Sequence, residues 1–327
     1  MNMNLAAKAA RRGGWFTRTD AIASGYTDDE IGRRVRAGRW VRLCHGAYAE
    51  PGADDESRTV WERASWRHLR AAKAIYHRLG GRAVVSHQSA LLLYGIEVSE
   101  LDLARVHVTR LAGHGRSSEL VCQHAARPPV AEPAEVDRVL VTPGPRSVVE
   151  AIRGTPYPVA VSVVDAALRQ RVATADQLSK ALELFSSSVG IGTAVRAVGF
   201  GDGRSESVGE SRLRVLLADL RLPAPVLQAE IRDAAGVLVA RVDFLLARWG
   251  IVIEFDGAVK YAGTGAEALI AEKRREDRIR DLGYEVVRVV WADLAAPAEL
   301  VGRIRRAMAR SQARRTPLPA YSVATAK

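Results

Sequence analysis

Residues 206–312 alternate between helical and strand patterns, and this order restricts the possible folds of the region most strongly. Hydrophobic periodicity predicts helices at 206–220, 266–282 and 297–315, and strands at 225–232, 237–246, 251–256 and 284–291. Glycine-containing turns separate the first three strands, as hairpins require. The sequence therefore predicts a single sheet flanked by helices, in the order α-β-β-β-α-β-α.

Three acidic residues belong to these apolar strands: Asp243, Glu254 and Asp256. Glu254 and Asp256 are two positions apart on a strand, so they project from the same face. Like charges in one site raise a carboxyl pKa and are unfavourable without a positive partner. Either neighbouring arginines such as Arg241 pair with these acids, or a divalent cation binds them. Mg²⁺ or Mn²⁺ suits the second alternative, because two or three carboxylates suffice as protein ligands.

The flanking helices add further candidates. Glu210 shares a helix face with Leu213 and Leu217, so it points toward the sheet. It either supports the acidic site or is a helix N-terminal acid stabilised by the macrodipole. Helix 266–282 is basic and either forms a solvated face or holds a DNA backbone. Its candidate residues are Lys273, Arg274, Arg275 and Arg278.

Five short motifs follow one another between residues 205 and 310. They are Ser207-x-x-Glu210, Arg241-x-Asp243-Phe, Glu254-x-Asp256-Gly-x-x-Lys260-Tyr, Glu272-Lys-Arg-Arg-Glu-Asp-Arg and Gly283-Tyr-x-Val-x-Arg288-x-x-Trp291. Together they resemble the Vsr-like endonuclease domain of the restriction-endonuclease-like superfamily. The resemblance implies Mg²⁺-dependent hydrolysis of phosphodiester bonds, with Asp243 and Glu254 as metal ligands and Glu210 in support. The superfamily has a lysine where this chain has Asp256, so Lys260 or Lys273 would supply that charge.

The charge balance indicates the kind of partner. The 327 residues include 48 Lys+Arg and 37 Asp+Glu, a formal net charge of +11, and such an excess favours polyanions. No apolar run approaches the ~20 residues of a membrane span, and the N-terminus lacks a secretory pattern. Two cysteines do not make a disulfide framework. We expect a cytoplasmic protein that binds double-stranded DNA.

The N-terminal 57 residues have the layout of a winged helix-turn-helix. A helix near Asp20 ends at Gly25, and Thr27 with Glu30 forms a capping box for a second helix. An alternating segment at 39–48 then predicts a short hairpin. The basic residues of the second helix and its end are candidate DNA contacts: Arg33, Arg34, Arg36 and Arg39.

This N-terminal part also carries a resemblance. Gly14-Trp-Phe-Thr-x-x-Asp20-Ala, Arg39-Trp-x-Arg-Leu-x-x-Gly46-x-Tyr48 and Ser86-His87-Gln-Ser89-Ala90 are similar to segments of AbiEi-type antitoxins of type IV toxin–antitoxin systems. The resemblance spans roughly residues 10–190. It implies a winged helix that binds promoter DNA as an autorepressor, and a cognate toxin as partner.

Residues 58–198 predict an α+β middle domain, and the glycine-rich segment 199–205 a linker, since it lacks the Lys-[Ser/Thr] of a Walker loop. A serine that caps the next helix explains Ser86-His87-x-Ser89 better than a hydrolase site does. The spacings of four further residues fit no zinc pattern, so the sequence does not favour a metal there: His107, His114, Cys122 and His124.

The sequence thus predicts a multidomain protein of the α+β or α/β class. Its predicted parts are a winged helix (1–57), a middle domain (58–198), a linker (199–205), a Vsr-like domain (206–312) and a tail (313–327). The preferred function is a DNA-binding protein with a metal-dependent endonuclease domain. The alternative is an AbiEi-like antitoxin or repressor whose nuclease-like domain is inert and only binds DNA. A third hypothesis is a toxin-neutralising interaction module. A homodimer is compatible with each.

Overall fold

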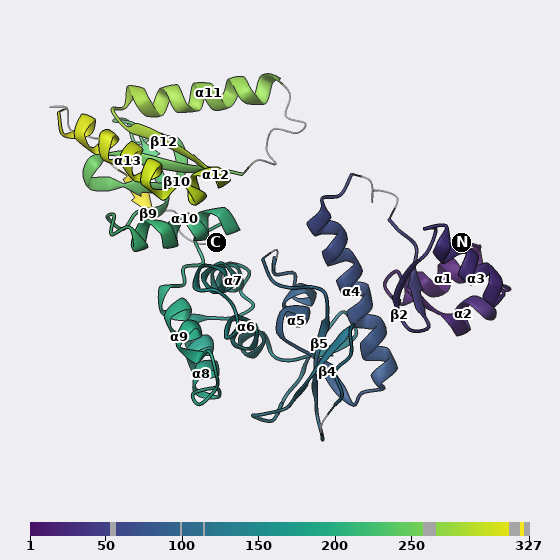
Figure 1. Ribbon diagram of the computed structural model, residues 1–327. Helices are drawn as coiled ribbons and strands as arrows, with labels where there is room; N and C mark the ends of the chain where they lie inside the picture. The colour runs from purple at the N-terminus through teal and green to yellow at the C-terminus, as the bar shows by residue number, and fades with distance from the viewer. Residues whose placement is uncertain (53–56, 99, 114, 258–265, 314–320, 324–327) are drawn as a thin grey trace. The chain divides into compact units, whose positions relative to one another are not determined.

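The computed structural model describes residues 1–52, 57–98, 100–113, 115–257, 266–313 and 321–323 (Figure 1). The chain forms two compact units. Unit 1 comprises Met1–Pro156 and Val172–Val195, and unit 2 comprises Tyr157–Arg171 and Arg196–Lys327. Both units mix helices with sheets, as predicted for the fold class. The domain division predicted from the sequence does not coincide with these units, since its middle domain (58–198) has residues in both, and it stays a prediction. No helix in the described ranges is long and apolar enough to cross a membrane.

Unit 1 begins with three helices and a small antiparallel sheet of order β1-β3-β2. The elements are α1 (Met3–Arg11), β1 (Phe16–Thr17), α2 (Arg18–Ile22), α3 (Asp28–Arg36), β2 (Val41–Cys44) and β3 (Ala47–Ala49). The predicted capping box of Thr27 and Glu30 is confirmed at the start of α3. An aromatic core around Trp40, Phe16 and Tyr26 joins the helices to the sheet. The sequence analysis did not identify α1.

The rest of unit 1 surrounds a five-stranded sheet of order β6-β5-β4-β8-β7. Its strands are β4 (Ala83–Val85), β5 (Val106–Arg110), β6 (Val121–Ala125), β7 (Ala134–Val136) and β8 (Val139–Val141). Its helices are α4 (Val60–Leu79), α5 (His87–Leu93), α6 (Gly144–Ile152) and α8 (Ala175–Glu183). Alanines and Ile75 on α4 pack into one apolar core with Val85, Val108 and Val141 of the sheet.

Unit 2 contains a five-stranded sheet of order β12-β11-β10-β9-β13, with β11 and β12 parallel and the other neighbours antiparallel. Its strands are β9 (Val226–Arg232), β10 (Leu238–Leu246), β11 (Ile251–Asp256), β12 (Glu285–Val290) and β13 (Tyr321–Val323). Its helices are α7 (Tyr157–Arg169), α10 (Val208–Asp219), α11 (Ala266–Asp281), α12 (Trp291–Ala295) and α13 (Pro297–Gln312). The element order predicted for 206–312 agrees with this structure except for the short helix α12, which begins at Trp291, the residue predicted to end the last strand.

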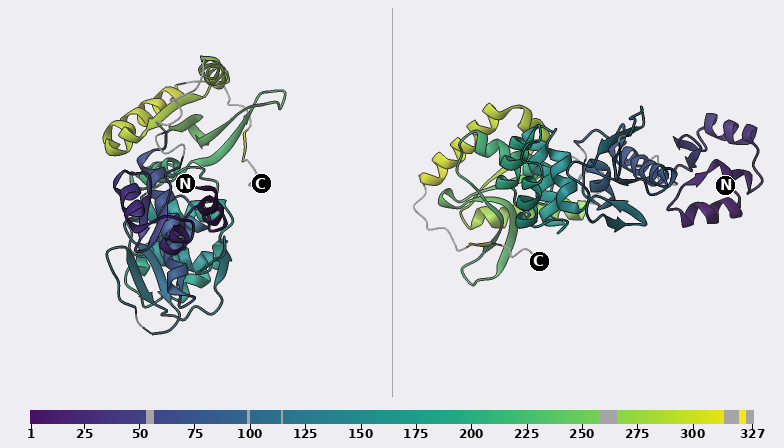
Figure 2. Two further views of the ribbon diagram at one scale, coloured as in Figure 1. Left: turned by 90° about the vertical axis from the view of Figure 1, so that its right-hand side faces the viewer. Right: turned by 90° about the horizontal axis from the view of Figure 1, so that it is seen from below.

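Helices cover both faces of the unit 2 sheet (Figure 2). Leu213 of α10 and Ile304 of α13 pack with Phe244 and Ile253 on one face. Ile279 of α11 packs with Val252 on the other face. The residues of β11 therefore alternate: its isoleucines face α10 and α13, and its even-numbered residues face α11.

The C-terminal segment differs from the sequence prediction. Residues 313–327 were predicted to be a tail, but Tyr321–Val323 forms β13 and pairs with Ala229–Ile231 of β9. An edge strand exposes unpaired backbone N–H and C=O groups, which favours the addition of a short segment of this kind. A further helix, α9 (Ile191–Phe200), precedes the turn at 201–207 and reaches two residues into the predicted linker.

Candidate nucleic-acid interface and acidic site

The first candidate site is a basic surface on α3, made of Arg33, Arg34, Arg36 and Arg39. Arg33, Arg36 and Arg39 are exposed. The guanidinium of Arg34 is half-buried and lies 4.9 Å and 5.3 Å from the ring centroids of Tyr26 and Trp40. These cation–π contacts hold Arg34 in place against the aromatic core.

This α3 arginine surface is concave. A hollow of about 350 Å³ is lined by Glu30, Arg33, Arg34, Ala37 and Arg39. The Glu30 carboxylate accepts hydrogen bonds from the backbone N–H and the hydroxyl of Thr27, so it is held toward the start of the helix. Three guanidinium groups around one hollow form a suitable contact for a phosphate group.

The second candidate site is the acidic cluster of unit 2, made of Glu210, Asp243, Glu254 and Asp256. The β10–β11 pairing ends with Phe244 opposite Ile253, so Asp243 and Glu254 are the next residues of the two strands, and, after burial, the charge of Asp243 raises the pKa of Glu254. A carboxylate oxygen of Asp243 accepts a hydrogen bond from the backbone N–H of Phe255 at 2.9 Å. The strand pairing predicted from the sequence thus brings these two acids together at one point of the sheet.

Arginines neutralise two of these acids. Both Glu254 oxygens accept hydrogen bonds from Arg275 Nη2, at 3.0 Å and 2.8 Å. Asp256 accepts one from Arg288 Nη1 at 2.8 Å, and Arg288 also binds Glu272 and Glu276. Burial raises the pKa of Glu254, Arg275 lowers it, and Asp243 raises it again. The sequence analysis left two alternatives for these acids, ion pairs with arginines or a bound metal ion. The structure contains the ion pairs, and their partners are Arg275 and Arg288. Arg241 instead pairs with Glu206.

Glu210 lies on the buried side of α10 and is 6% exposed. It accepts hydrogen bonds from the Glu206 backbone N–H, the Ser207 hydroxyl and the Gln228 side-chain amide. Even so, burial and then the charge of Asp243 raise its pKa to about 7. A carboxyl group with this pKa exchanges protons near neutral pH, as general acids and bases do.

The donor chemistry of the acidic cluster fits Mg²⁺ or Mn²⁺, since all its ligand atoms are oxygens. A cation there would also relieve the repulsion that raises the pKa of Glu210. The ligand atoms of the acidic cluster are spread out, however. Within the described ranges, three or more candidate ligands have their ligand atoms all within 4.8 Å of one another in one place, and that place is in unit 1. Arg275 would have to release at least one oxygen of Glu254 to a metal ion.

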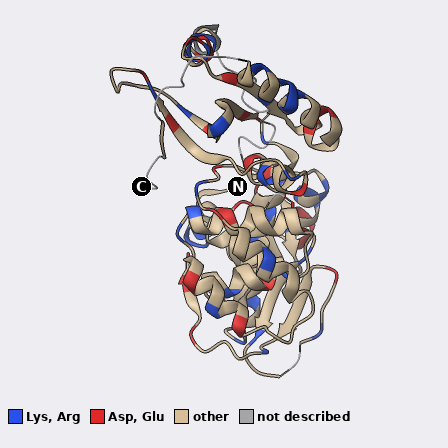
Figure 3. Cartoon of the chain, turned by 90° about the vertical axis from the view of Figure 1, so that its left-hand side faces the viewer, with Lys and Arg blue, Asp and Glu red and all other residues tan. Residues whose placement is uncertain are grey.

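The remaining predicted residues are distributed differently. Lys260 lies outside the described residues. Lys273 and Arg274 are exposed on α11, whereas Arg275 binds Glu254 and Arg278 donates to the backbone carbonyl of Val239. Lysine and arginine are interspersed with acidic residues along the helices of unit 2 (Figure 3). The basic run of α11 is thus partly directed into the protein.

Two residues of the acidic site were missed in the sequence analysis. Arg288, quoted there only within a motif, binds three carboxylates. Its place opposite Glu254 in the parallel β11–β12 register was the signal for this role. Gln228 is buried, binds Glu210 and has a φ of 51°. A left-handed conformation inside a strand is costly for a residue other than glycine, and no sequence pattern indicated it.

Comparison with known proteins supports the N-terminal resemblance. Residues 3–51 match the family described as "Transcriptional regulator, AbiEi antitoxin". The chain is also 27% identical over 290 residues to the uncharacterized proteins MT2308 and Rv2248 of Mycobacterium tuberculosis, strains CDC 1551 / Oshkosh and H37Rv. Each alignment covers 88% of this chain and 98% of the relative. The similarity to these relatives therefore extends over both units.

Proposed function

We propose that this chain is a DNA-binding regulator of the AbiEi antitoxin type, in which the N-terminal residues form a winged helix. The concave α3 arginine surface carries the proposal, because it lies within the segment that matches the regulator family. Its exposed guanidinium groups are arranged for phosphate contact, and the net charge of +11 favours association with DNA. Regulators of this type would act with a cognate toxin, and a second copy of the chain would contact the other half of a symmetric site.

DNA binding by the full chain tests this proposal. Fluorescence anisotropy would compare a duplex from upstream of its own reading frame with a shuffled duplex of equal composition. We expect tighter binding to the upstream duplex and a marked loss in Arg33→Ala. The matched control is Arg127→Ala, which removes an equally charged exposed residue from another part of unit 1. Equal affinity for both duplexes, or unchanged binding in Arg33→Ala, would refute the proposal.

A second candidate function is metal-dependent hydrolysis of DNA in unit 2. It rests on the proximity of Asp243 to both Glu254 and Glu210, because burial and then the charge of Asp243 raise the pKa of each of these carboxyl groups, that of Glu210 to about 7. Asp243, Glu254 and Asp256 would hold Mg²⁺ or Mn²⁺, which supplies Lewis-acid activation of a phosphodiester and a water. Glu210 would hold or release a proton near this point, and the exposed Lys273 would attract the DNA backbone.

Relaxation of supercoiled plasmid tests this second function. The full chain would be incubated with Mg²⁺, Mn²⁺ or EDTA, beside Asp243→Asn and Glu254→Gln. We expect nicking that requires the metal and is lost in both variants. Glu299→Gln, an exposed acid on α13, serves as the control. If nicking persists in both variants, a contaminating nuclease is responsible. If DNA binds without nicking, unit 2 is inert and the regulator function alone remains.

A further inference from the structure

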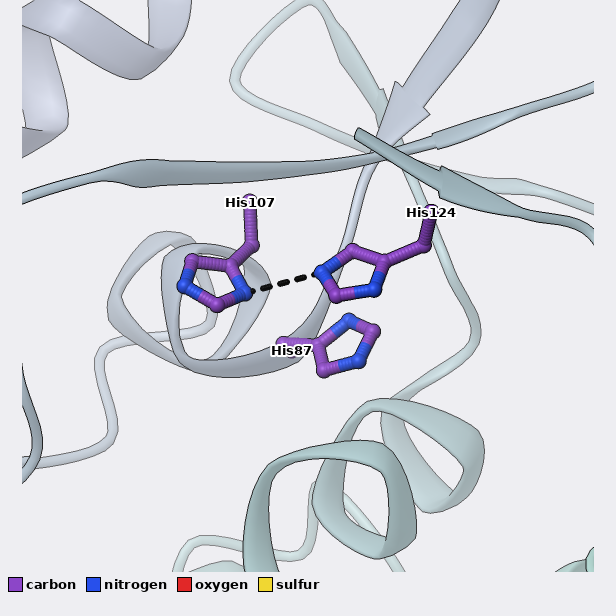
Figure 4. A group of neighbouring side chains, drawn as sticks. All are labelled: His87, His107 and His124. Carbon is purple, nitrogen blue, oxygen red and sulfur yellow. Dashed lines mark hydrogen bonds between the residues drawn. The ribbon is translucent and has the colours of Figure 1, made fainter. Parts of the chain in front are cut away.

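Three histidines come together in unit 1, and none of them belongs to either site described above (Figure 4). His107 lies on β5, His124 on the neighbouring β6, and His87 is the first residue of α5. One ring nitrogen of each lies within 4.8 Å of the other two. We call His87, His107 and His124 the histidine cluster. The sequence analysis did not favour a metal near His107 and His124, because their spacings fit no zinc pattern.

Strand pairing explains how the cluster forms. The parallel β5–β6 register pairs His107 with Cys122 and Thr109 with His124, so both imidazoles project from one face of the sheet. His107 Nδ1 and His124 Nε2 are 3.0 Å apart. In a tetrahedral site with metal–nitrogen bonds of 2.0–2.1 Å, two ligand nitrogens are about 3.3 Å apart. These two imidazoles are therefore already near the separation that one ion requires.

His87 contributes the third imidazole of the cluster from the start of α5. Its ring stacks on that of His124, with centroids 3.9 Å apart. Its backbone has a φ of 54°, a left-handed conformation that is uncommon outside glycine. The sequence analysis explained a serine of this motif as a helix cap. Ser86 occupies the N-cap position of α5, but its side chain makes no capping hydrogen bond, and its hydroxyl lies 3.0 Å from His87 Nδ1. Strain of this kind persists where surrounding contacts hold it, and often at functional sites.

All three imidazoles favour the neutral form that metals bind. Burial lowers the pKa of each, and the neighbouring charges of the cluster and of nearby arginines lower it further. The pKa of His107 falls to about 4. In the neutral pair of His107 and His124, one ring nitrogen donates its proton to the lone pair of the other. A bound cation would take the place of that shared proton and accept a lone pair from each ring.

The surroundings supply what a metal site needs beyond its ligands. The Ser86 hydroxyl, 3.0 Å from His87 Nδ1, orients the His87 ring, and a carboxylate oxygen of Glu150 lies 3.6 Å from the same nitrogen. Gln88 Nε2 lies 3.1 Å from His107 Nε2. If a metal ion binds Nδ1 of His107, the ring proton moves to Nε2, and Nε2 then no longer accepts a hydrogen bond from Gln88 Nε2. A cavity of about 450 Å³, lined by His87, His107 and Arg153 among others, leaves one side of the cluster open.

We propose that the histidine cluster binds one transition-metal ion, Zn²⁺ foremost, through three imidazole nitrogens with a fourth position open to the cavity. Nitrogen ligands favour Zn²⁺, Cu²⁺ or Ni²⁺ over Mg²⁺. Three protein ligands and one open position are typical of zinc sites that bind water or an anion, whereas structural zinc sites have four protein ligands. Arg153 at the cavity wall suits an anion at the open position. The site would tie β5, β6 and α5 together.

Zinc binding by the full chain tests the proposal. Protein stripped with a chelator would be titrated with ZnSO₄ by calorimetry, and zinc retained after dialysis measured by mass spectrometry. We expect one zinc per chain and a rise in Tm on binding. His107→Gln and His124→Gln should each lose affinity by more than the roughly 10- to 100-fold typical of residues that only orient a ligand. Two variants keep the test valid if one of them fails to fold, as circular dichroism without metal would show.

Matched controls locate the ion. His45→Gln removes an exposed histidine outside the cluster and should bind zinc as the unmodified chain does. Asp243→Asn should also keep its zinc, because the acidic cluster belongs to unit 2. The proposal is overturned if the unmodified chain takes up no zinc, or if both histidine variants retain it. Loss of zinc in Asp243→Asn alone would overturn it as well, by placing the ion in unit 2.

Discussion

Helices α3 and α11 each carry several arginines, which are balanced in number by acidic residues of the same helix, but the arginines are used differently. The α3 arginine surface borders a hollow open to solvent, and only Arg34 packs against its own domain. On α11, Arg275 binds the buried Glu254, Arg278 reaches a backbone carbonyl, and Arg280 pairs with Glu276. A count of charges therefore overstates how much of α11 is available to DNA. The comparison teaches that arginines on a helix beside buried acids pair with those acids before they are available to a partner molecule.

The largest expected effect concerns Glu210, the buried acid of α10. Its pKa is raised from 4.5 to about 7 on folding, so the folded chain keeps a proton that the unfolded chain has lost. The contribution of Glu210 to the free energy of unfolding is then largest below pH 4.5, and it falls by about 3 kcal/mol as the pH rises to 7. Glu210→Gln should remove this decrease, measured as hydrogen exchange of β11 amides at pH 5 and pH 8. If the exposed control Glu299→Gln has the same effect, the decrease does not originate in the acidic cluster.

The next effect tests whether Arg275 serves the protein itself. Arg275→Ala leaves Glu254 buried without its guanidinium partner, which should cost about 2 kcal/mol, less than a fully buried pair because Arg275 is 34% exposed. The loss should be present near neutral pH and fade in acid, as Glu254 becomes protonated. Urea unfolding would measure it, with Lys273→Ala as control. Equal, small effects of both substitutions would show that the two cations are alike, and the contrast with α3 would fail.

DNA affinity at several salt concentrations tests the contrast directly. If Arg33 and Arg39 each neutralise one phosphate, their double substitution by alanine lowers the salt slope by about 2 and the affinity at 0.15 M salt by roughly 30-fold. The double substitution of Lys273 and Arg274 removes the same charge and should change binding to the upstream duplex little. Similar losses in both variants would show that α11 contacts this DNA as α3 does.

The smallest effect concerns Arg34, the residue of the α3 surface that packs inward. Arg34→Ala removes the contacts with Tyr26 and Trp40 and should lower stability by about 1 kcal/mol. Thermal unfolding followed by tryptophan fluorescence would measure this, with the exposed Arg36→Ala as the comparison. A larger loss in Arg36→Ala than in Arg34→Ala would contradict the packing role.

The sequence predicted the elements of unit 2 well because its patterns are regular. Strands with period-two burial and a helix with leucines three and four apart leave little choice of element. The sequence did not reveal β13, because Tyr321–Val323 gains its partner only from the free edge of β9. Helix α1 was missed in a similar way, because only Leu5 and Ala9 of it are buried.

The candidate sites were predictable where neighbours in sequence determine the geometry. Asp243, Glu254 and Asp256 lie on strands whose register follows from a short turn, so their proximity could be expected. The histidine cluster depends on the β5–β6 register and on the unusual backbone of His87, neither of which has a local signature. Distant pairing decides such sites, and spacing rules for zinc motifs do not detect them.

The path of the chain between the units limits how the protein can be dissected. Helix α7 belongs to unit 2, although residues 172–195, which follow it, return to unit 1. Its fully buried Asp165 accepts hydrogen bonds from Arg214 and Ser211 of α10 and from the Asp202 backbone N–H. A fragment that begins at residue 206 would lack α7 and leave the Arg214 side chain without this carboxylate. Gene fusions and recombination between relatives should therefore keep the two units together. A separation of the units, by recombination or by limited proteolysis, should inactivate unit 2.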